Sequence, residues 1–300
     1  MPIADSINPI KPRIKRLNLA MINSSKIWFI TGVSGGLGRS LAIEVAESGD
    51  IVFGTLRKPE QIEEFNQLVH GKTFGLELDV NDHHRIKLLI THILDQFGRI
   101  DVLVNNAGYG LFGAIKEVSI EEARKQMETN FFSVLAITQQ VLPIMRRQES
   151  GCIIQISSMA GIRSNPGLGI YNASKFALEG FSEALSLETA AMNIKVMIVE
   201  PGPFRTDWAG SSSIRSEKIL NEYNSTAGER IKTINNYSGN QPGDPVKGAK
   251  AIIKAIKSQN PPLRLVLGKV ALDGIREKLK SMEQNLSEWE TVSIGTSFEK

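Results

Sequence analysis

The amino-acid sequence predicts an α/β protein: a doubly wound parallel sheet of about seven strands, with helices on both faces in a three-layer αβα arrangement. Two observations indicate this fold class. Short apolar runs alternate with longer amphipathic stretches, which is typical of βαβ units. A glycine-rich segment, ITGVSGGLG, joins the first apolar run to the first amphipathic stretch. Because the 300 residues show no internal repeat and no second core, we predict one domain over residues 26–300.

Each strand is predicted from a short apolar run bounded by polar or turn residues. The predicted strands, of which the last is the weakest, cover residues 26–31, 51–55, 73–78, 101–105, 151–157, 195–200 and 264–267. The helices are predicted from amphipathic stretches between these runs. Proline marks two of the helix starts, at Pro59 and Pro245, since a first-turn N–H has no helical partner to lose. The predicted helices cover residues 36–48, 60–69, 82–97, 119–147, 170–191, 245–257 and 271–290.

Two segments lie outside this pattern. Residues 1–25 are basic near Lys11 but contain no long apolar region and no small-residue cleavage site, so we expect a disordered N-terminal extension. Residues 203–243 have no clear period and are rich in Ser, Gly and Asn. Loops of that length are usually functional or disordered, and we predict a substrate loop with short helices.

Composition excludes several classes of function. The formal net charge of +3 is too small for a nucleic-acid surface, and no apolar segment approaches the roughly 18 residues of a membrane span. The single cysteine, Cys152, lies in an apolar run, so we expect it in the core of a protein from a reducing, cytoplasmic compartment. The four histidines lie without nearby cysteine or aspartate clusters, so we expect no metal site.

The glycine-rich segment is the first candidate site. Gly32, Gly36 and Gly38 lie where a strand turns into a helix, and the free N–H groups and dipole of a helix start attract phosphate. The expected anion is the pyrophosphate of a dinucleotide. Glycines also serve ordinary tight turns, so this segment alone does not identify a ligand.

The spacing Thr-Gly-x-x-x-Gly-x-Gly resembles that of the short-chain dehydrogenase/reductase family, which implies a Rossmann-type fold. Further family motifs follow in order between residues 26 and 206: Asn105-Asn106-Ala107-Gly108, Asn130, Ser157-Ser158, Tyr171 with Lys175, Pro201-Gly202, and Thr206. Residues 171–180, YNASKFALEG, resemble the branch that contains 17β-hydroxysteroid and retinol dehydrogenases.

Tyr171 and Lys175 also have a physical rationale. Positions i and i+4 of a helix share a face, so the two side chains project side by side. A free tyrosine has a pKa of about 10, and a neighbouring ammonium favours the phenolate, so we expect a lowered pKa for Tyr171. Two exposed residues on an ordinary helix are the alternative, which Ser158, thirteen positions upstream, makes less attractive.

The resemblance implies a role for each of four residues. Tyr171 donates a proton to the substrate oxygen in carbonyl reduction, or removes it in alcohol oxidation, and Ser158 hydrogen-bonds that oxygen. Lys175 holds the nicotinamide ribose, and Asn130 helps maintain a water linked to Lys175. Ser157 is expected to end the strand structurally. Hydride passes between nicotinamide and substrate carbon without a metal.

The residues after the second strand bear on the choice of dinucleotide. An acidic residue there suits NAD, whereas arginine suits the extra phosphate of NADP. The chain reads Thr55-Leu56-Arg57-Lys58, so we favour NADP(H), with NAD(H) use still possible because Ser34 and Gly35 are not basic. Asp79 is expected either to meet the adenine or to cap a turn. The cofactor contacts that the resemblance implies are Gly32, Ser34, Gly35, Gly36, Leu37, Gly38, Arg57, Asp79, Val80, Asn106, Ala107, Gly108, Tyr171, Lys175, Pro201, Gly202, Phe204 and Thr206.

The expected pocket walls are mostly apolar, which favours a hydrophobic alcohol or ketone over a phosphorylated sugar. Some of these residues are equally explained by packing at the sheet edge. They are Tyr109, Leu111, Phe112, Ile162, Leu168, Phe204 and Trp208.

Two other functions remain open. A sugar-nucleotide epimerase shares the Tyr/Lys pair but has a different glycine spacing and a larger substrate domain, and an NADP-binding sensor usually loses Tyr or Lys.

Family members pair through the helices expected here at 119–147 and 170–191, so a homodimer or homotetramer is expected. The C-terminal extension from Leu272 to Lys300 is long enough to cover one of those surfaces, which leaves the number of subunits open.

Overall fold

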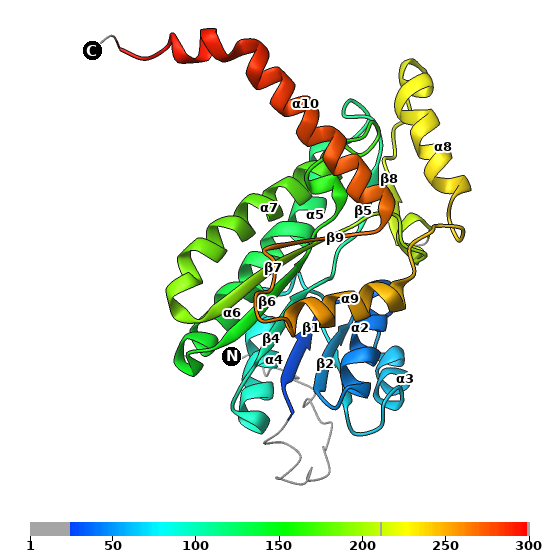
Figure 1. Ribbon diagram of the computed structural model, residues 1–300. Helices are drawn as coiled ribbons and strands as arrows, with labels where there is room; N and C mark the ends of the chain where they lie inside the picture. Colours follow the sequence, from blue (N-terminus) through cyan, green and yellow to red (C-terminus); the bar gives the residue numbers. More distant parts are fainter. Residues whose placement is uncertain (1–24, 211, 299–300) are drawn as a thin grey trace, which may run out of the picture.

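A computed structural model describes residues 25–210 and 212–298 of the chain. Its centre is a seven-stranded parallel sheet in the order β3-β2-β1-β4-β6-β7-β9 (Figure 1). The order reverses direction beside β1, which is typical of a doubly wound Rossmann-type sheet. The strands are β1 (Ile27–Ile30), β2 (Ile51–Leu56), β3 (Thr73–Glu77), β4 (Val102–Asn105), β6 (Gly151–Ile156), β7 (Ile194–Pro201) and β9 (Arg264–Leu267).

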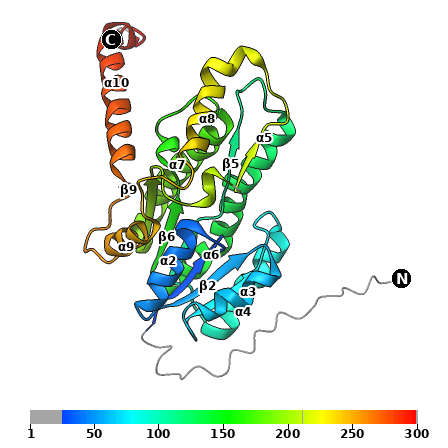
Figure 2. The same ribbon diagram turned by 90° about the vertical axis from the view of Figure 1, so that its right-hand side faces the viewer.

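Helices cover both faces of the sheet. One apolar core joins the sheet to α4 (His83–Phe97), α6 (Ser133–Gln148) and α7 (Gly169–Thr189). The other joins it to α2 (Gly36–Glu47), α3 (Ile62–Gln67) and α9 (Pro245–Ile256) (Figures 1 and 2). The predicted three-layer αβα class is therefore confirmed.

Local sequence explains where the helices begin. Ser119 and Glu122 form a reciprocal capping box at the start of α5 (Ile120–Met127). Asp82 accepts the N–H of Arg85 at 3.0 Å and so caps α4. At α9, Asp244 caps a helix whose first residue is Pro245, as the sequence predicts.

The structure departs from the predicted elements in two places. The helix predicted over 119–147 is divided into α5 and α6 by a π-helical turn, η2 (Glu128–Phe132). Two unpredicted three-residue strands, β5 (Gly110–Phe112) and β8 (Ser213–Arg215), pair with one another outside the main sheet. Strands this short carry too few residues to show a period of two, so the sequence pattern could not reveal them.

Residues 203–243 form the long segment that was predicted to be a substrate loop. Besides β8 it contains α8 (Glu229–Asn236), the 3-10 turns η5 (Asp207–Ala209) and η6 (Asn221–Tyr223), and the π-helical turn η7 (Asn224–Gly228). The bridge between Phe204 and Gly243 closes this segment at its base. Short helices were expected here, and they are present.

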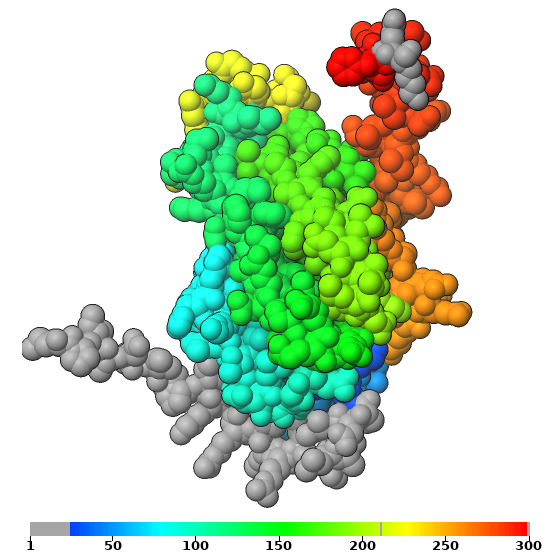
Figure 3. All heavy atoms as spheres, turned by 90° about the vertical axis from the view of Figure 1, so that its left-hand side faces the viewer, coloured from blue at the N-terminus to red at the C-terminus, as the bar shows by residue number. Residues whose placement is uncertain are grey.

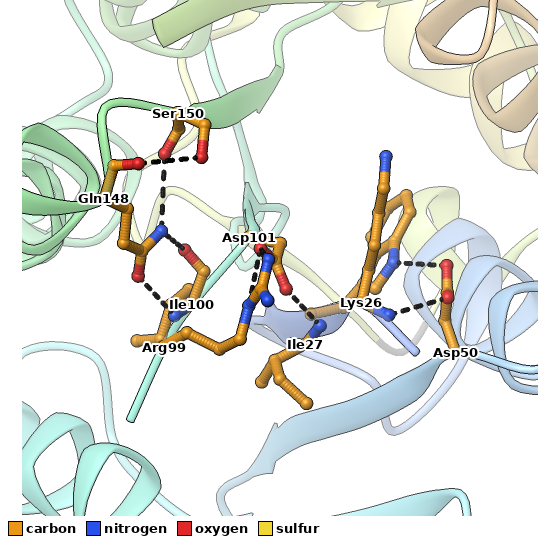
Figure 4. A network of polar contacts seen from close by, with 9 residues as sticks. Lys26, Ile27, Asp50, Arg99, Ile100, Asp101, Gln148 and Ser150 are labelled. Carbon is orange, nitrogen blue, oxygen red and sulfur yellow. Dashed lines mark hydrogen bonds and ion pairs between the residues drawn. The ribbon is translucent and has the colours of Figure 1, made fainter. Parts of the chain in front are cut away.

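Polar side chains fasten the amino ends of the strands to one another (Figure 4). Asp101 accepts the main-chain N–H of Ile27 at 2.8 Å and the side chain of Arg99 at 2.9 Å. Gln148 bonds both the N–H and the C=O of Ile100, at 3.0 and 2.9 Å. The polar atoms of this network are matched to main-chain groups or to one another, which suits a purely structural role.

The chain ends in a long helix, α10 (Lys269–Ile294), whose outer half stands clear of the body (Figures 1 and 3). The predicted N-terminal extension falls almost wholly on residues 1–24, outside the described part of the chain. Across the described residues, no helix combines the length and apolar character that crossing a bilayer requires.

Candidate active site

The glycine-rich turn lies at the carboxyl end of β1 and leads into α2. Gly32 and Gly36 have positive φ angles of 71° and 58°, which L side chains rarely adopt. A Cβ at Gly38 would lie 2.3 Å from the side chain of Asn106, so the backbone is packed too closely for any other residue. Gly35 supplies no side-chain cap to α2, which leaves its first N–H groups for a ligand. This cradle fits the pyrophosphate of a dinucleotide.

A polar clamp holds the carboxyl ends of β1 and β4 together. Asn106 donates to the main-chain oxygens of Thr31 and Gly32 at 2.9 and 2.8 Å. In return, the Thr31 hydroxyl accepts the N–H groups of Asn106 and Ala107, both at 3.0 Å. The side chain of Asn106 therefore fixes the shape of the glycine-rich turn. The sequence predicted that Asn106 contacts the cofactor, but it did not predict the hydrogen bonds between Asn106 and Thr31.

Asn130 fixes the segment that leaves β4. Its amide accepts the N–H of Tyr109 at 3.1 Å, and donates to the Tyr109 C=O and the Ser174 hydroxyl, both at 3.0 Å. Asn130 lies in the π-helical turn η2, which a regular helical period does not predict. A Cβ at Gly108 would lie 3.1 Å from Asn130 and 3.9 Å from the Lys175 amine, so both side chains approach this glycine.

Ser158, Tyr171 and Lys175 converge at the carboxyl end of β6. Ser158 follows β6, and its hydroxyl accepts the N–H of Ala160 at 3.1 Å. Ser158 is also close enough to the Tyr171 phenol to act toward lowering its pKa. The Lys175 amine donates to the Ile156 C=O at 2.8 Å and lies 5.9 Å from the centre of the Tyr171 ring. Tyr171 and Lys175 are 5% and 6% exposed, so both polar groups have been withdrawn from water.

The expected lowering of the tyrosine pKa is wrong for this arrangement. Burial raises the pKa of Tyr171 to about 12, against a smaller lowering by the Ser158 hydroxyl. Burial also lowers the pKa of Lys175 to about 8, which Glu179 partly opposes. Desolvation therefore dominates both groups, and a neutral phenol is the stable form at neutral pH.

Trp208, from the long loop, covers the tyrosine. Its ring lies 5.0 Å from the ring of Tyr171 and 5.4 Å from that of Phe112, centre to centre. Leu168 completes the buried apolar contact around Tyr171. Beyond it, a hollow of about 380 Å³ is lined by residues that include Ile115 and Tyr223.

A second charged group lies behind the lysine. Glu179, one helical turn after Lys175, forms an ion pair of 3.4 Å with Arg264 of β9. Arg264 also pairs at 3.3 Å with Glu200, the penultimate residue of β7. Glu200 is 1% exposed, and burial together with Glu179 raises the pKa of its carboxyl to about 7. Sequence reasoning missed this cluster, because β7 and β9 bring its members together from distant positions.

Other predicted contacts lie around the same sheet edge. Arg57 is exposed directly after β2. Ser34 lies in the glycine-rich turn after β1, the strand that pairs with β2. Asp79 accepts the N–H of Asn81 at 3.0 Å, so the capping role considered for it is present. A Cβ at Gly36 would lie 3.2 Å from Thr206, which brings the segment after β7 against the glycine turn.

Phe204 packs differently from what a pocket wall requires. Its ring would lie 2.8 Å from a Cβ at Gly243 and 2.7 Å from one at Gly248, so it is directed toward the start of α9. Leu111, Phe112 and Leu168 are buried, while Ile162 follows the short turn η3 (Met159–Gly161). The remaining predicted cofactor residues lie at or after the carboxyl ends of β1, β3, β4 and β7. They are Leu37, Val80, Ala107, Pro201 and Gly202.

Comparisons with known proteins agree with this arrangement. A family model described as short chain dehydrogenase matches residues 26–217. A 3-ketodihydrosphingosine reductase from Bacteroides thetaiotaomicron is 40% identical over 245 residues, 81% of this chain and 88% of that protein. The structure of a short-chain dehydrogenase from Streptomyces avermitilis matches with a TM-score of 0.86 at 40% identity, over 91% of this chain and 99% of that one. ElxO with NADP bound matches with a TM-score of 0.69 at 26% identity, over 83% and 99%. The chain belongs to the short-chain dehydrogenase family of oxidoreductases.

Proposed function

We propose that this oxidoreductase reduces the carbonyl group of a hydrophobic substrate to an alcohol with NADPH. The observation that carries the proposal is the buried contact of Tyr171 with Ser158, beside Lys175 and next to the glycine cradle. These groups supply a proton donor, a hydrogen-bond donor and a cation at one point of the sheet edge where a dinucleotide fits.

When bound, a reduced nicotinamide would supply the hydride that the side chains of this protein cannot supply. The main chain of Gly32 to Gly38 would hold the pyrophosphate, and Lys175 would hold the nicotinamide ribose. Ser158 would hydrogen-bond the carbonyl oxygen and fix its position relative to the Tyr171 hydroxyl. Tyr171 would then deliver its proton as negative charge develops on that oxygen.

The protonation state of Tyr171 matches the proton donor that carbonyl reduction needs. With its pKa raised to about 12 by burial, the phenol keeps its proton throughout the physiological range. A protonated phenol is ready to donate to a developing alkoxide, whereas oxidation of an alcohol needs the phenolate. The Lys175 amine, whose pKa burial lowers to about 8, is suited to return a proton to the tyrosine after each turnover.

Arg57 supports the choice of NADP(H). It lies directly after β2, the strand beside the glycine turn, and its side chain is exposed. Lys58 adds a second cation, and no acidic residue takes the position that would bind the ribose hydroxyls of NAD. ElxO, a solved relative, binds NADP.

The cover of the site supports a hydrophobic substrate. Trp208, Phe112 and Leu168 surround Tyr171 with apolar surface, so a substrate carbonyl would approach through an apolar layer. The relative from Bacteroides thetaiotaomicron is named as a reductase of 3-ketodihydrosphingosine. We therefore place a long-chain or ring ketone first among the substrate classes.

The proposal is tested by NADPH consumption across a panel of hydrophobic aldehydes and ketones, for the natural chain and for Tyr171→Phe. We expect turnover of panel members by the natural chain and its loss in Tyr171→Phe, which keeps the ring and removes the hydroxyl. NADPH binding, followed by fluorescence, should persist in both proteins. Binding without turnover of any member would instead favour the NADP-binding sensor.

We also propose that the chain forms homo-oligomers in the cytoplasm. Large apolar side chains are exposed on α7 and on the adjoining π-helical turn, with Leu187 77% and both Phe132 and Phe176 44% exposed. Such exposure on neighbouring elements is typical of an interface. Cys152 is partly buried against the core, and desolvation raises its thiol pKa to about 12, which is consistent with a reducing compartment.

A further inference from the structure

The outer half of α10 has no packing partner within the described chain. The buried residues of this helix, Ala271, Gly274 and Ile275, all lie near its start. Every residue from 279 to 294 is exposed, and Figures 1 and 3 show this half projecting beyond the body. Isolated helices of this length are only marginally stable in water, so a partner would stabilise it substantially.

The exposed half carries an apolar stripe along one face. Leu279, Met282, Leu286 and Trp289 are between 48% and 64% exposed, and they are spaced three, four and three residues apart. The same spacing leads back by four residues to Ile275, which packs on the body. An alternation of three and four residues is the heptad pattern of a helix that pairs with another helix.

Charge is distributed unevenly along the same helix. Arg276, Lys278 and Lys280 lie at the end near the body, whereas Glu283, Glu288 and Glu290 lie on the outer half. A helix that binds a bilayer surface usually presents lysine and arginine along its polar face. The acidic outer half therefore favours a protein partner over an anionic membrane.

We propose that the stripe pairs with the α10 helix of a second copy, in antiparallel orientation. Leu279 then packs near Trp289 of the second copy, and Met282 near its Leu286. The antiparallel arrangement brings Arg276 beside Glu290 of the second copy, twice by symmetry. The two bodies lie at opposite ends of a shared seam that runs from Leu279 to Trp289, about 15 Å long at a helical rise of 1.5 Å per residue.

Light scattering of the full chain tests the pairing. Leu286→Glu places a charge in the seam, and we expect it to halve the molar mass at micromolar concentrations. Ser281→Glu adds the same charge away from the apolar stripe and should leave the mass unchanged. An equal mass for all three proteins across the concentration range would overturn the proposal.

A charge exchange tests the orientation. Glu290→Arg alone should weaken association, because it opposes Arg276 of the second copy. Adding Arg276→Glu to the same chain should restore association, since each pair regains opposite charges. Failure of the double variant to recover, with the single variant weakened, would contradict the antiparallel register.

A vesicle experiment separates the pairing from lipid binding. The natural chain should remain unbound in sedimentation with phosphatidylcholine vesicles and with vesicles that also contain phosphatidylserine. Binding that is lost in Leu286→Glu at unchanged mass would assign the stripe to a lipid surface and overturn the proposal. None of these outcomes depends on catalysis, so they are independent of the proposed reaction.

Discussion

The two edges of the central sheet both carry polar side chains, but they use them differently. At the amino edge, Asp101 and Gln148 match main-chain groups at 2.8 to 3.0 Å. At the carboxyl edge, Glu179 and Glu200 are held by longer ion pairs of 3.4 and 3.3 Å, and Lys175 is buried with a lowered pKa. Matched polar groups stabilise a fold, whereas buried charges with perturbed pKa values mark a functional site.

Because of this difference, we expect the amino edge to serve stability and the carboxyl edge to serve the proposed reaction. The amino-edge network gains stability because each acceptor replaces water with a main-chain donor. At the carboxyl edge, Tyr171 and Lys175 are buried, and their desolvation lowers the stability of the fold. The same desolvation sets the protonation states that the proposed reaction needs. Substitutions at the two edges should therefore have opposite consequences for stability and activity.

The largest effect is expected from Tyr171→Phe at the carboxyl edge. Removing the hydroxyl removes the proton donor while keeping the ring against Trp208. Steady-state kinetics should show kcat/KM lowered by roughly 10²- to 10⁴-fold, the usual range for a general acid. Unfolding midpoints near that of the natural chain would show that the loss is chemical, and an unchanged kcat/KM would remove Tyr171 from the proposed reaction.

The next effect is expected from Asp101→Ala at the amino edge. It leaves the N–H of Ile27 and the side chain of Arg99 without their acceptor, which should lower the free energy of unfolding by about 2 to 3 kcal/mol. Urea titration measures this loss. Asp50→Ala, a matched change at a more exposed site, should cost less, and kcat per folded molecule should be unaffected in both. If Asp101→Ala lowered kcat as much as Tyr171→Phe does, the proposed difference in role between the two edges of the sheet would be wrong.

A smaller effect is expected from Arg57→Asp, at the nucleotide end of the carboxyl edge. Because the carboxylate repels the 2′-phosphate and accepts ribose hydroxyls, the ratio of kcat/KM for NADPH to that for NADH should fall tenfold or more, about 1.4 kcal/mol. Arg39→Asp is a useful control, since Arg39 is already paired with Glu64 at 2.6 Å. A natural preference for NADH would contradict the assignment of Arg57.

The smallest effect is a gain in stability. The folded-state pKa of Lys175 is about 8, below its ordinary 10.5, so the unfolded chain binds more protons between these values. The cost of burying the ammonium is thus fully present below pH 8 and disappears as pH rises through 10.5. Lys175→Met removes this cost of about 3 kcal/mol but also removes the hydrogen bond to the Ile156 C=O. The free energy of unfolding should therefore rise by about 1 to 2 kcal/mol at pH 7, and the gain should shrink toward pH 10. Urea titration at both pH values checks this difference, and a variant less stable at pH 7 would contradict it.

The sequence predicted the sheet well, because parallel strands buried on both faces are nearly continuous apolar runs. It also predicted which side chains meet at the carboxyl edge, since motifs at strand ends converge there whatever the helices between them do. Their catalytic and cofactor roles remain predictions. The sequence could not predict the π-helical turn at Asn130, the strand pair β5 and β8, or the ion pairs of Arg264, all of which depend on contacts between distant segments. It also gave the wrong direction for the pKa of Tyr171, because adjacency to a lysine is visible in a sequence and burial is not.

The account is tested most directly by following the hydride itself. NADPH carrying deuterium on the transferred position of C4 should deliver one deuterium to the former carbonyl carbon of the product, detected by mass spectrometry. We expect product one mass unit heavier with the natural chain, and with Tyr171→Phe the same labelled product formed roughly 10²- to 10⁴-fold more slowly. An unlabelled alcohol product formed by the natural chain from fully labelled cofactor would contradict direct transfer at the carboxyl edge.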